Sequence, residues 1–159
     1  MTFALGLGVG ATVAPVTAGR NEAAPPVASP IVQPAETGAV RMAHPAEVVR
    51  VLDGDTFEAR VHLWPGLEIT TRVRLRGIDA PEMKARCGEE RARAEAARDT
   101  LRSILDQGEV GISNVALDKY GGRILADAST QATPNVSTAL LGAGAVRRYS
   151  GGQRDGWCG

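Results

Sequence analysis

Four groups of polar residues could carry chemistry, because each places charged side chains within a few positions of one another. The groups are Asp53 with Asp55; Asp79 with Glu82; Arg72, Arg74 and Arg76; and Asp118, Lys119, Tyr120 and Arg123. Taken singly, each has a plain structural interpretation. Asp53-Gly54 is a common hairpin turn, and arginines at alternate positions are typical of the solvated face of a strand.

Taken together, the four groups favour one kind of chemistry. Carboxylates with few nitrogen or sulfur ligands favour a hard cation such as Ca²⁺ or Mg²⁺. Arginines beside such a cation and a spare carboxylate meet the needs of phosphoryl chemistry, which are charge neutralisation, positioning of the phosphate and a base for water. The combination therefore predicts a site for phosphate hydrolysis.

The first three groups lie at the ends of predicted strands. Residues 48–52 form a short apolar run, and residues 56–63 alternate between apolar and polar side chains. Residues 69–76 alternate in the same way and end at Gly77. These periods predict three antiparallel strands joined by tight turns. The Asp53-Gly54 turn and the loop after residue 77 would then present the carboxylates.

The rest of the chain predicts two helices and two more strands. Apolar residues at helical spacing predict a helix over 89–105, in which Glu89 and Arg93 form an i,i+4 pair. Strands follow over 109–117 and 123–128. A second helix fits 134–141, with Thr133 as its N-cap and Gly142 beyond its end. The order β-β-β-α-β-β-α predicts an α+β protein with a five-stranded OB-type barrel, although periodicity alone also allows other α+β folds.

The spacing of these motifs resembles that of a known family. Residues 49–56, 74–82 and 118–123 look like the three signature blocks of the staphylococcal nuclease (thermonuclease) family. Residues 149–154, which precede Trp157-Cys158, resemble a C-terminus common among its short bacterial members. The resemblance covers about residues 46–159 and implies the family's OB-type barrel with two to three helices.

The resemblance implies a calcium site. Asp55 and Asp79 would be carboxylate ligands of Ca²⁺, and the backbone carbonyl of Ala80 would be a third ligand. The family's type protein has Thr at that third position, and Ala retains the carbonyl while losing the contacts of the hydroxyl. Asp53 would be a turn residue beside the ligands.

The resemblance also implies the catalytic and substrate-binding residues. Glu82 would orient or deprotonate the attacking water, and Arg74 would contact the phosphate. Arg123 would contact it from the other side and help the leaving 5′-oxygen, although an extra glycine precedes Arg123 in this chain. Lys119 and Tyr120 would hold a terminal phosphate. Substitution of Arg74 by Ala or of Glu82 by Gln would remove most activity and leave folding largely intact.

The activity so implied is calcium-dependent endonucleolytic hydrolysis of DNA and RNA, preferably single-stranded or frayed, by a monomer. It would leave 3′-phosphate ends with little base specificity, since phosphates carry no sequence information. Two alternatives stay open. One is a catalytically inactive nuclease-like module that binds nucleic acid or protein, and the other is an exported OB-type module that contacts protein or saccharide.

The composition is that of an ordinary soluble domain, with 43% hydrophobic and 23% charged residues in 159. The net charge is zero, from 18 basic and 18 acidic residues, which predicts weak binding of nucleic acid away from a local positive site. Sixteen of the basic residues are Arg. That bias suits bidentate phosphate contacts and fits a compositional origin equally well.

The N-terminal third bears on the compartment. Residues 1–18 predict a signal peptide or a hydrophobic anchor, and residues 19–45 predict a Pro/Ala-rich disordered linker before a domain over 46–159. The chain would then be secreted or periplasmic, with anchoring to the membrane or a flexible cytosolic tail as alternatives. Cys87 and Cys158 are either free thiols or one disulfide. If the chain is exported, a disulfide would close a loop of about 70 residues, worth about 4 kcal/mol.

Overall fold

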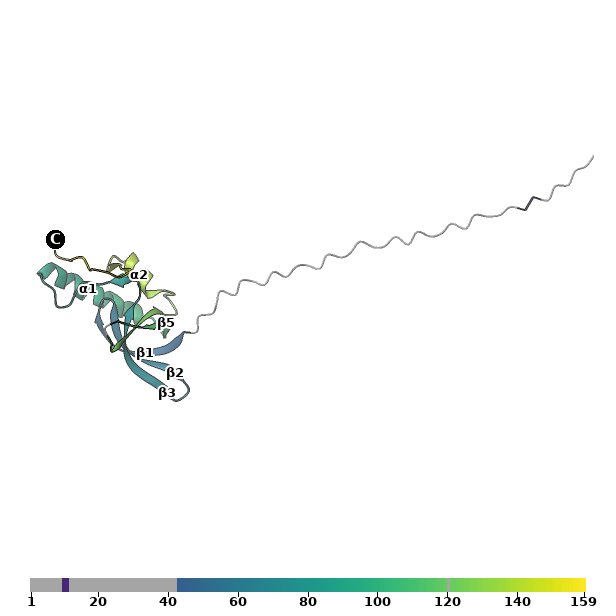
Figure 1. Ribbon diagram of the computed structural model, residues 1–159, viewed down its shortest axis with the longest axis horizontal. Coiled ribbons are helices and arrows are strands. Elements are labelled where there is room, and N and C mark those ends of the chain that lie inside the picture. Colours follow the sequence, from purple (N-terminus) through teal and green to yellow (C-terminus); the bar gives the residue numbers. More distant parts are fainter. Residues whose placement is uncertain (1–9, 12–42, 120) are drawn as a thin grey trace, which may run out of the picture. The chain divides into compact units, whose positions relative to one another are not determined.

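The computed structural model describes residues 10–11, 43–119 and 121–159 (Figure 1). Apart from residues 10–11, the predicted leader (1–18) lies outside these residues, as does nearly all of the predicted linker (19–45). The first strand begins at His44, so the last two residues of the predicted linker belong to it. Of the helices in the described residues, none combines the length and the apolar character needed to cross a bilayer.

Five strands close into a barrel. The strands are β1 (His44–Asp53), β2 (Thr56–Trp64), β3 (Leu67–Leu75), β5 (Val110–Leu117) and β6 (Arg123–Ser129). Their order around the barrel is β1-β2-β3-β6-β5, and β1 closes it by antiparallel pairing with β5. Only β3 and β6 run parallel among the paired strands of the described barrel. The predicted five-stranded OB-type barrel is confirmed.

Two helices and a small second sheet complete the domain. Helix α1 spans Gly88–Leu105 and helix α2 spans Val136–Gly142. Strands β4 (Ile78–Asp79) and β7 (Arg147–Arg148) pair antiparallel outside the barrel. Figure 1 shows both helices at one end of the barrel and the β2–β3 hairpin extending from the other end.

Alternation along the strands builds the core where the barrel is closed. Phe57, Ala59 and Val61 of β2 are 0–2% exposed, and the apolar positions of α1 that were predicted from helical spacing pack at the barrel end. Past the closed part of the barrel, alternation no longer buries the apolar side chains. Leu63 is 38% exposed and Ile69 is 42% exposed, because the tip of the β2–β3 hairpin projects past the core.

The start of α2 was predicted wrongly. Its N-cap is Asn135, whose side chain accepts a hydrogen bond from the Thr138 N–H at 2.7 Å, and Gly142 lies inside the helix. Thr133 instead donates its backbone N–H to Thr130 Oγ1 at 3.0 Å. Both residues are good caps, and the turn at Thr130 decides between them.

A disulfide joins Cys87 to Cys158, with their Cα atoms 6.1 Å apart. Cys87 is also the N-cap of α1, since its Sγ lies 3.4 Å from the N–H of Glu90. The bond therefore fixes the end of the chain to the start of α1, 71 residues earlier.

Candidate active site

Asp55 lies in the turn between β1 and β2 and is 2% exposed. Its Oδ1 accepts from Arg74 Nη1 at 2.6 Å and from Thr56 Oγ1 at 2.9 Å, and its Oδ2 accepts from the Ala80 N–H at 3.0 Å. The β2–β3 register pairs Thr56 with Arg74, which places this arginine beside the turn. The barrel backbone thus sets the position of the Asp55 carboxylate.

Gly54 holds this turn close to its neighbours. A Cβ at Gly54 would lie 2.6 Å from the Cβ of Ala97 on α1 and 2.9 Å from the Cβ of Ala80. Both distances are shorter than van der Waals contact allows. The glycine of the predicted hairpin is therefore needed for close packing, and a larger residue would displace Asp55.

Arg74 is buried, although strand alternation places it on a polar face. It is 7% exposed, and its Nη2 donates to the Ile78 carbonyl at 3.3 Å and lies 3.8 Å from Asp79 Oδ1. Arg72 is exposed, as the alternation predicts. The interpretation as a solvated face is wrong for Arg74, because the turn at Asp55 and the loop after β3 cover that end of the barrel.

Asp79 is 1% exposed and lies among three arginines. Its Oδ2 accepts from Arg147 Nε at 3.2 Å and Nη2 at 3.0 Å, which follows from the pairing of β4 with β7. Its Oδ1 lies 3.1 Å from Arg154 Nε in an ion pair, yet accepts no well-formed hydrogen bond in the described part of the chain. A buried carboxylate oxygen with this deficit is suited to a cation.

Glu82 follows Pro81 and projects from the loop, with its side chain 56% exposed and paired with Arg154. Buried Glu90 on α1 supports the backbone of this loop. Its Oε1 accepts from the Glu82 N–H at 3.4 Å, and its Oε2 accepts from the Arg86 N–H at 3.1 Å. Sequence reasoning missed Glu90, because an acidic residue in the first turn of a helix needs no further explanation.

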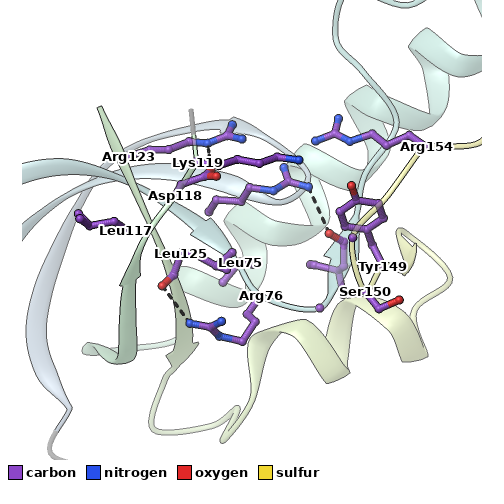
Figure 2. A pocket seen from close by; sticks show the side chains of 14 residues that line it. Leu75, Arg76, Leu117, Asp118, Lys119, Arg123, Leu125, Tyr149, Ser150 and Arg154 are labelled. Atoms are coloured by element: carbon purple, nitrogen blue, oxygen red, sulfur yellow. Dashed lines mark hydrogen bonds and ion pairs between the residues drawn. The ribbon is translucent and has the colours of Figure 1, made fainter. Parts of the chain in front are cut away.

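A cavity of about 570 Å³ is lined by Arg74 and Arg154, the partners of Asp55 and Asp79 (Figure 2). Its polar lining consists of Arg74, Arg76, Asp118, Lys119, Tyr149, Ser150, Arg123 and Arg154. Figure 2 shows Lys119 and Arg123 on one side and Arg154 on the other. Tyr120 lies outside the described residues. A cavity of this size, lined by five cationic side chains and one carboxylate, is suited to a phosphorylated ligand.

The extra glycine before Arg123 does not remove this residue from the cavity. Gly121 and Gly122 have φ of 63° and 65°, values that favour glycine, and β6 begins at Arg123, paired with Arg72. Arg123 Nε forms an ion pair with Asp118. The two glycines therefore complete the turn before the strand starts.

The carboxylates fit a hard divalent cation. Burial, with a smaller contribution from the neighbouring Asp55, raises the pKa of Asp53 to about 7, so this carboxyl carries less negative charge at neutral pH than an exposed aspartate. Asp55 and Asp79 offer oxygen donors only, which suits Ca²⁺ or Mg²⁺. Ala80 is 4% exposed and lies against Asp55 through its N–H. The structure therefore brings together the predicted ligand residues Asp55, Asp79 and Ala80, with Arg74 in contact.

Known proteins are similar to this chain over much of the region that forms the site. The family model "Staphylococcal nuclease homologue" matches residues 72–155, which include Arg74, Asp79, Glu82 and Arg123 but begin after Asp55. The chain is 39% identical over 75 residues to a micrococcal nuclease of Shigella flexneri, which covers 47% of this chain and 37% of the relative.

Two Escherichia coli proteins are also similar. Protein ParB is 32% identical over 110 residues, covering 65% of this chain and 56% of the relative. An uncharacterized endonuclease is 34% identical over 102 residues, covering 64% and 59%. The chain thus spans between 37% and 59% of the length of these curated relatives. With more than half of its residues matched by the family model, the chain belongs to the staphylococcal nuclease homologue family.

Proposed function

We propose that the chain is a calcium-dependent endonuclease that hydrolyses phosphodiester bonds in DNA and RNA to leave 3′-phosphate ends. One observation carries the proposal: the buried cluster of Asp55, Arg74 and Asp79 adjoins a cavity of about 570 Å³ lined by cationic side chains. Two relatives whose names include nuclease or endonuclease support it.

In this proposal Asp55, Asp79 and the Ala80 carbonyl would hold the cation, which would supply charge neutralisation at the phosphate. Arg74 and Arg123 hold the phosphate oxygens from two sides of the cavity. Their guanidinium groups are fixed before substrate arrives, by Asp55 and by Asp118, so little reorganisation accompanies the reaction.

Glu82 orients the attacking water and accepts its proton. The Glu90 contacts to the backbone of the 82–86 loop fix the position from which Glu82 acts. Lys119 and Tyr120 bind a terminal phosphate, which favours single-stranded or frayed ends of the substrate. Since every one of these groups contacts phosphate or water, we expect little base specificity.

Export of a monomer to the periplasm or the medium is part of the same proposal. The disulfide supports it, because such bonds persist in oxidising compartments. Cell fractionation with mass determination of the mature chain tests it. Recovery of the full-length chain only in the cytosol would contradict export.

The activity is tested by incubating a single-stranded DNA oligomer with the oxidised protein and comparing its cleavage in Ca²⁺ with its cleavage in a chelator. Replacement of Glu82 by Gln should lower kcat by about 10²-fold or more, since it removes the base. The control is Glu109→Gln, which should match the wild type, because Glu109 is an exposed carboxylate outside the cavity. Absence of Ca²⁺-dependent cleavage would reject the nuclease. Retention of the oligomer without cleavage would instead support the non-catalytic binding module.

A further inference from the structure

The C-terminal segment (residues 149–159) is held against the carboxylates at several points. Arg147, which precedes it, donates to the carbonyls of Asp155 and Gly156, and its guanidinium lies 4.3 Å from the ring centroid of Trp157. The disulfide at Cys158 fixes the far end. The segment therefore returns to the site instead of leaving the domain.

This arrangement brings Arg154 onto two carboxylates that the proposed function uses. Its Nε lies 3.1 Å from Asp79 Oδ1, the buried oxygen that accepts no well-formed hydrogen bond, and its Nη1 pairs with Glu82. Arg154 lines the cationic cavity and also a second cavity of about 420 Å³, which Asp79, Ala80 and Glu82 line. Arg154 therefore lies at the junction of the carboxylates and the phosphate-binding side chains.

The charges around Arg154 explain why it stays there. Its guanidinium is paired with the carboxylates of Asp79 and Glu82, and these ion pairs offset the cost of its partial burial. A divalent cation at the same carboxylates would remove this attraction and repel the guanidinium. The guanidinium and the cation are thus alternative partners of Asp79 Oδ1.

We propose that Arg154 is the internal counter-ion of the candidate cation site, displaced by the divalent cation and then bound to the substrate phosphate in the adjoining cavity. The disulfide keeps Arg154 within reach of both partners, since Cys158 lies four residues further along the chain. The phosphate-binding half of the proposal rests on the proposed nuclease function, whereas the counter-ion half does not.

Calorimetric titration of the metal-free, oxidised protein with Ca²⁺ tests the counter-ion half without substrate. The Arg154→Ala variant lacks the ion pair that competes with Ca²⁺, so it should bind Ca²⁺ about tenfold more tightly than the wild type. Arg154→Lys, which keeps the charge, should lie between Arg154→Ala and the wild type. The control is Arg148→Ala, which removes the same charge from an exposed side chain of β7 that lines neither cavity. Unchanged or weaker binding by Arg154→Ala would overturn the proposal.

Steady-state cleavage of a single-stranded DNA oligomer at saturating Ca²⁺ tests the phosphate half. Loss of one phosphate contact should lower kcat/KM of Arg154→Ala about tenfold, despite the tighter Ca²⁺ binding. Equal kcat/KM in Arg154→Ala and Arg148→Ala would overturn this half. If the wild type did not cleave at all, the nuclease function would fail while the Ca²⁺ titration would still decide the counter-ion role.

The paired substitution Cys87→Ser and Cys158→Ser tests the role of the disulfide. Serine keeps an N-cap at α1, so the change chiefly releases the C-terminal segment. We expect Ca²⁺ binding to tighten in the same direction as in Arg154→Ala, with circular dichroism showing a folded domain. Wild-type Ca²⁺ affinity in the folded double variant would show that the disulfide does not hold Arg154 in place.

Discussion

Two regions of the molecule supply arginines to Asp79, and each region holds its arginine in place by different contacts. Arg74 comes from the barrel, where strand register and burial fix it, and its side chain is 8% exposed. Arg147 belongs to a two-residue strand that leads into the C-terminal segment, and its side chain is 31% exposed. The ion pair of Arg74 with Asp79, at 3.8 Å, therefore depends on the whole barrel, whereas the hydrogen bonds of Arg147 to Asp79, at 3.0 and 3.2 Å, depend on a few side chains.

The comparison separates a rigid part of the site from an adjustable part. Contacts within the barrel cannot change without loss of the backbone pairing that creates them. Apart from the disulfide, contacts of the C-terminal segment are ion pairs, hydrogen bonds and a ring contact, so they can exchange while the barrel and the disulfide stay intact. The proposed nuclease site, which would fix a phosphate and also admit a cation, would use both parts.

Replacement of Arg74 by Ala should give the largest loss of stability. The Asp55 carboxylate is 2% exposed and would lose the guanidinium at 2.6 Å, leaving a buried charge without its main partner. Breaking a buried pair in this way costs about 3–5 kcal/mol. Urea denaturation of oxidised, metal-free protein measures it. This burial revises the expectation from sequence that Arg74→Ala would leave folding largely intact.

The neighbouring Arg72 provides the matched control. It lies two residues away on the same strand, and its side chain is exposed. Replacement of an exposed arginine by Ala should change the free energy of unfolding by less than about 1 kcal/mol. Similar losses in Arg72→Ala and Arg74→Ala would show that burial of Arg74 is not what stabilises the barrel end.

Local sequence patterns predicted the barrel and helix α1 well. Alternation in residues 56–61 and helical spacing from Ala94 to Leu105 are set by which side faces the core, so they are visible in the sequence. The resemblance to a family placed Asp55, Asp79 and Arg74 in one site, and the structure brings these three into contact.

The C-terminal half of the site could not be predicted in the same way. Arg147 and Arg154 reach Asp79 through a two-residue β4–β7 pairing and a cross-link between residues 71 positions apart. Two-residue strands show no periodicity, and pairing over such distances leaves no local pattern. The role of Glu90 in supporting the 82–86 loop is hidden for another reason, since an acidic residue in the first turn of a helix is already explained by the helix dipole.

Removal of the disulfide should have the next largest effect. The paired change of Cys87 and Cys158 to Ser should lower the free energy of unfolding by about 2–4 kcal/mol, because the unfolded chain regains the entropy of a long loop. Trypsin should also cut the double variant after Arg154 well before it cuts the barrel. Simultaneous cleavage of both regions would show that the C-terminal segment does not detach separately, and so would remove the distinction between them.

Replacement of Arg147 by Ala should have the smallest effect of the three. Its guanidinium donates to Asp79 at 3.0 and 3.2 Å and lies over Trp157, but it is partly exposed, and Asp79 would keep Arg74 and Arg154 as neighbours. We expect a loss of about 1–2 kcal/mol in urea denaturation, from one partly screened ion pair and one ring contact. Arg148→Ala on the same short strand, with an exposed side chain, should lose less than about 0.5 kcal/mol. A loss in Arg147→Ala as large as in Arg74→Ala would mean that the C-terminal segment is as integral to the fold as the barrel, and that it is not an adjustable part of the site.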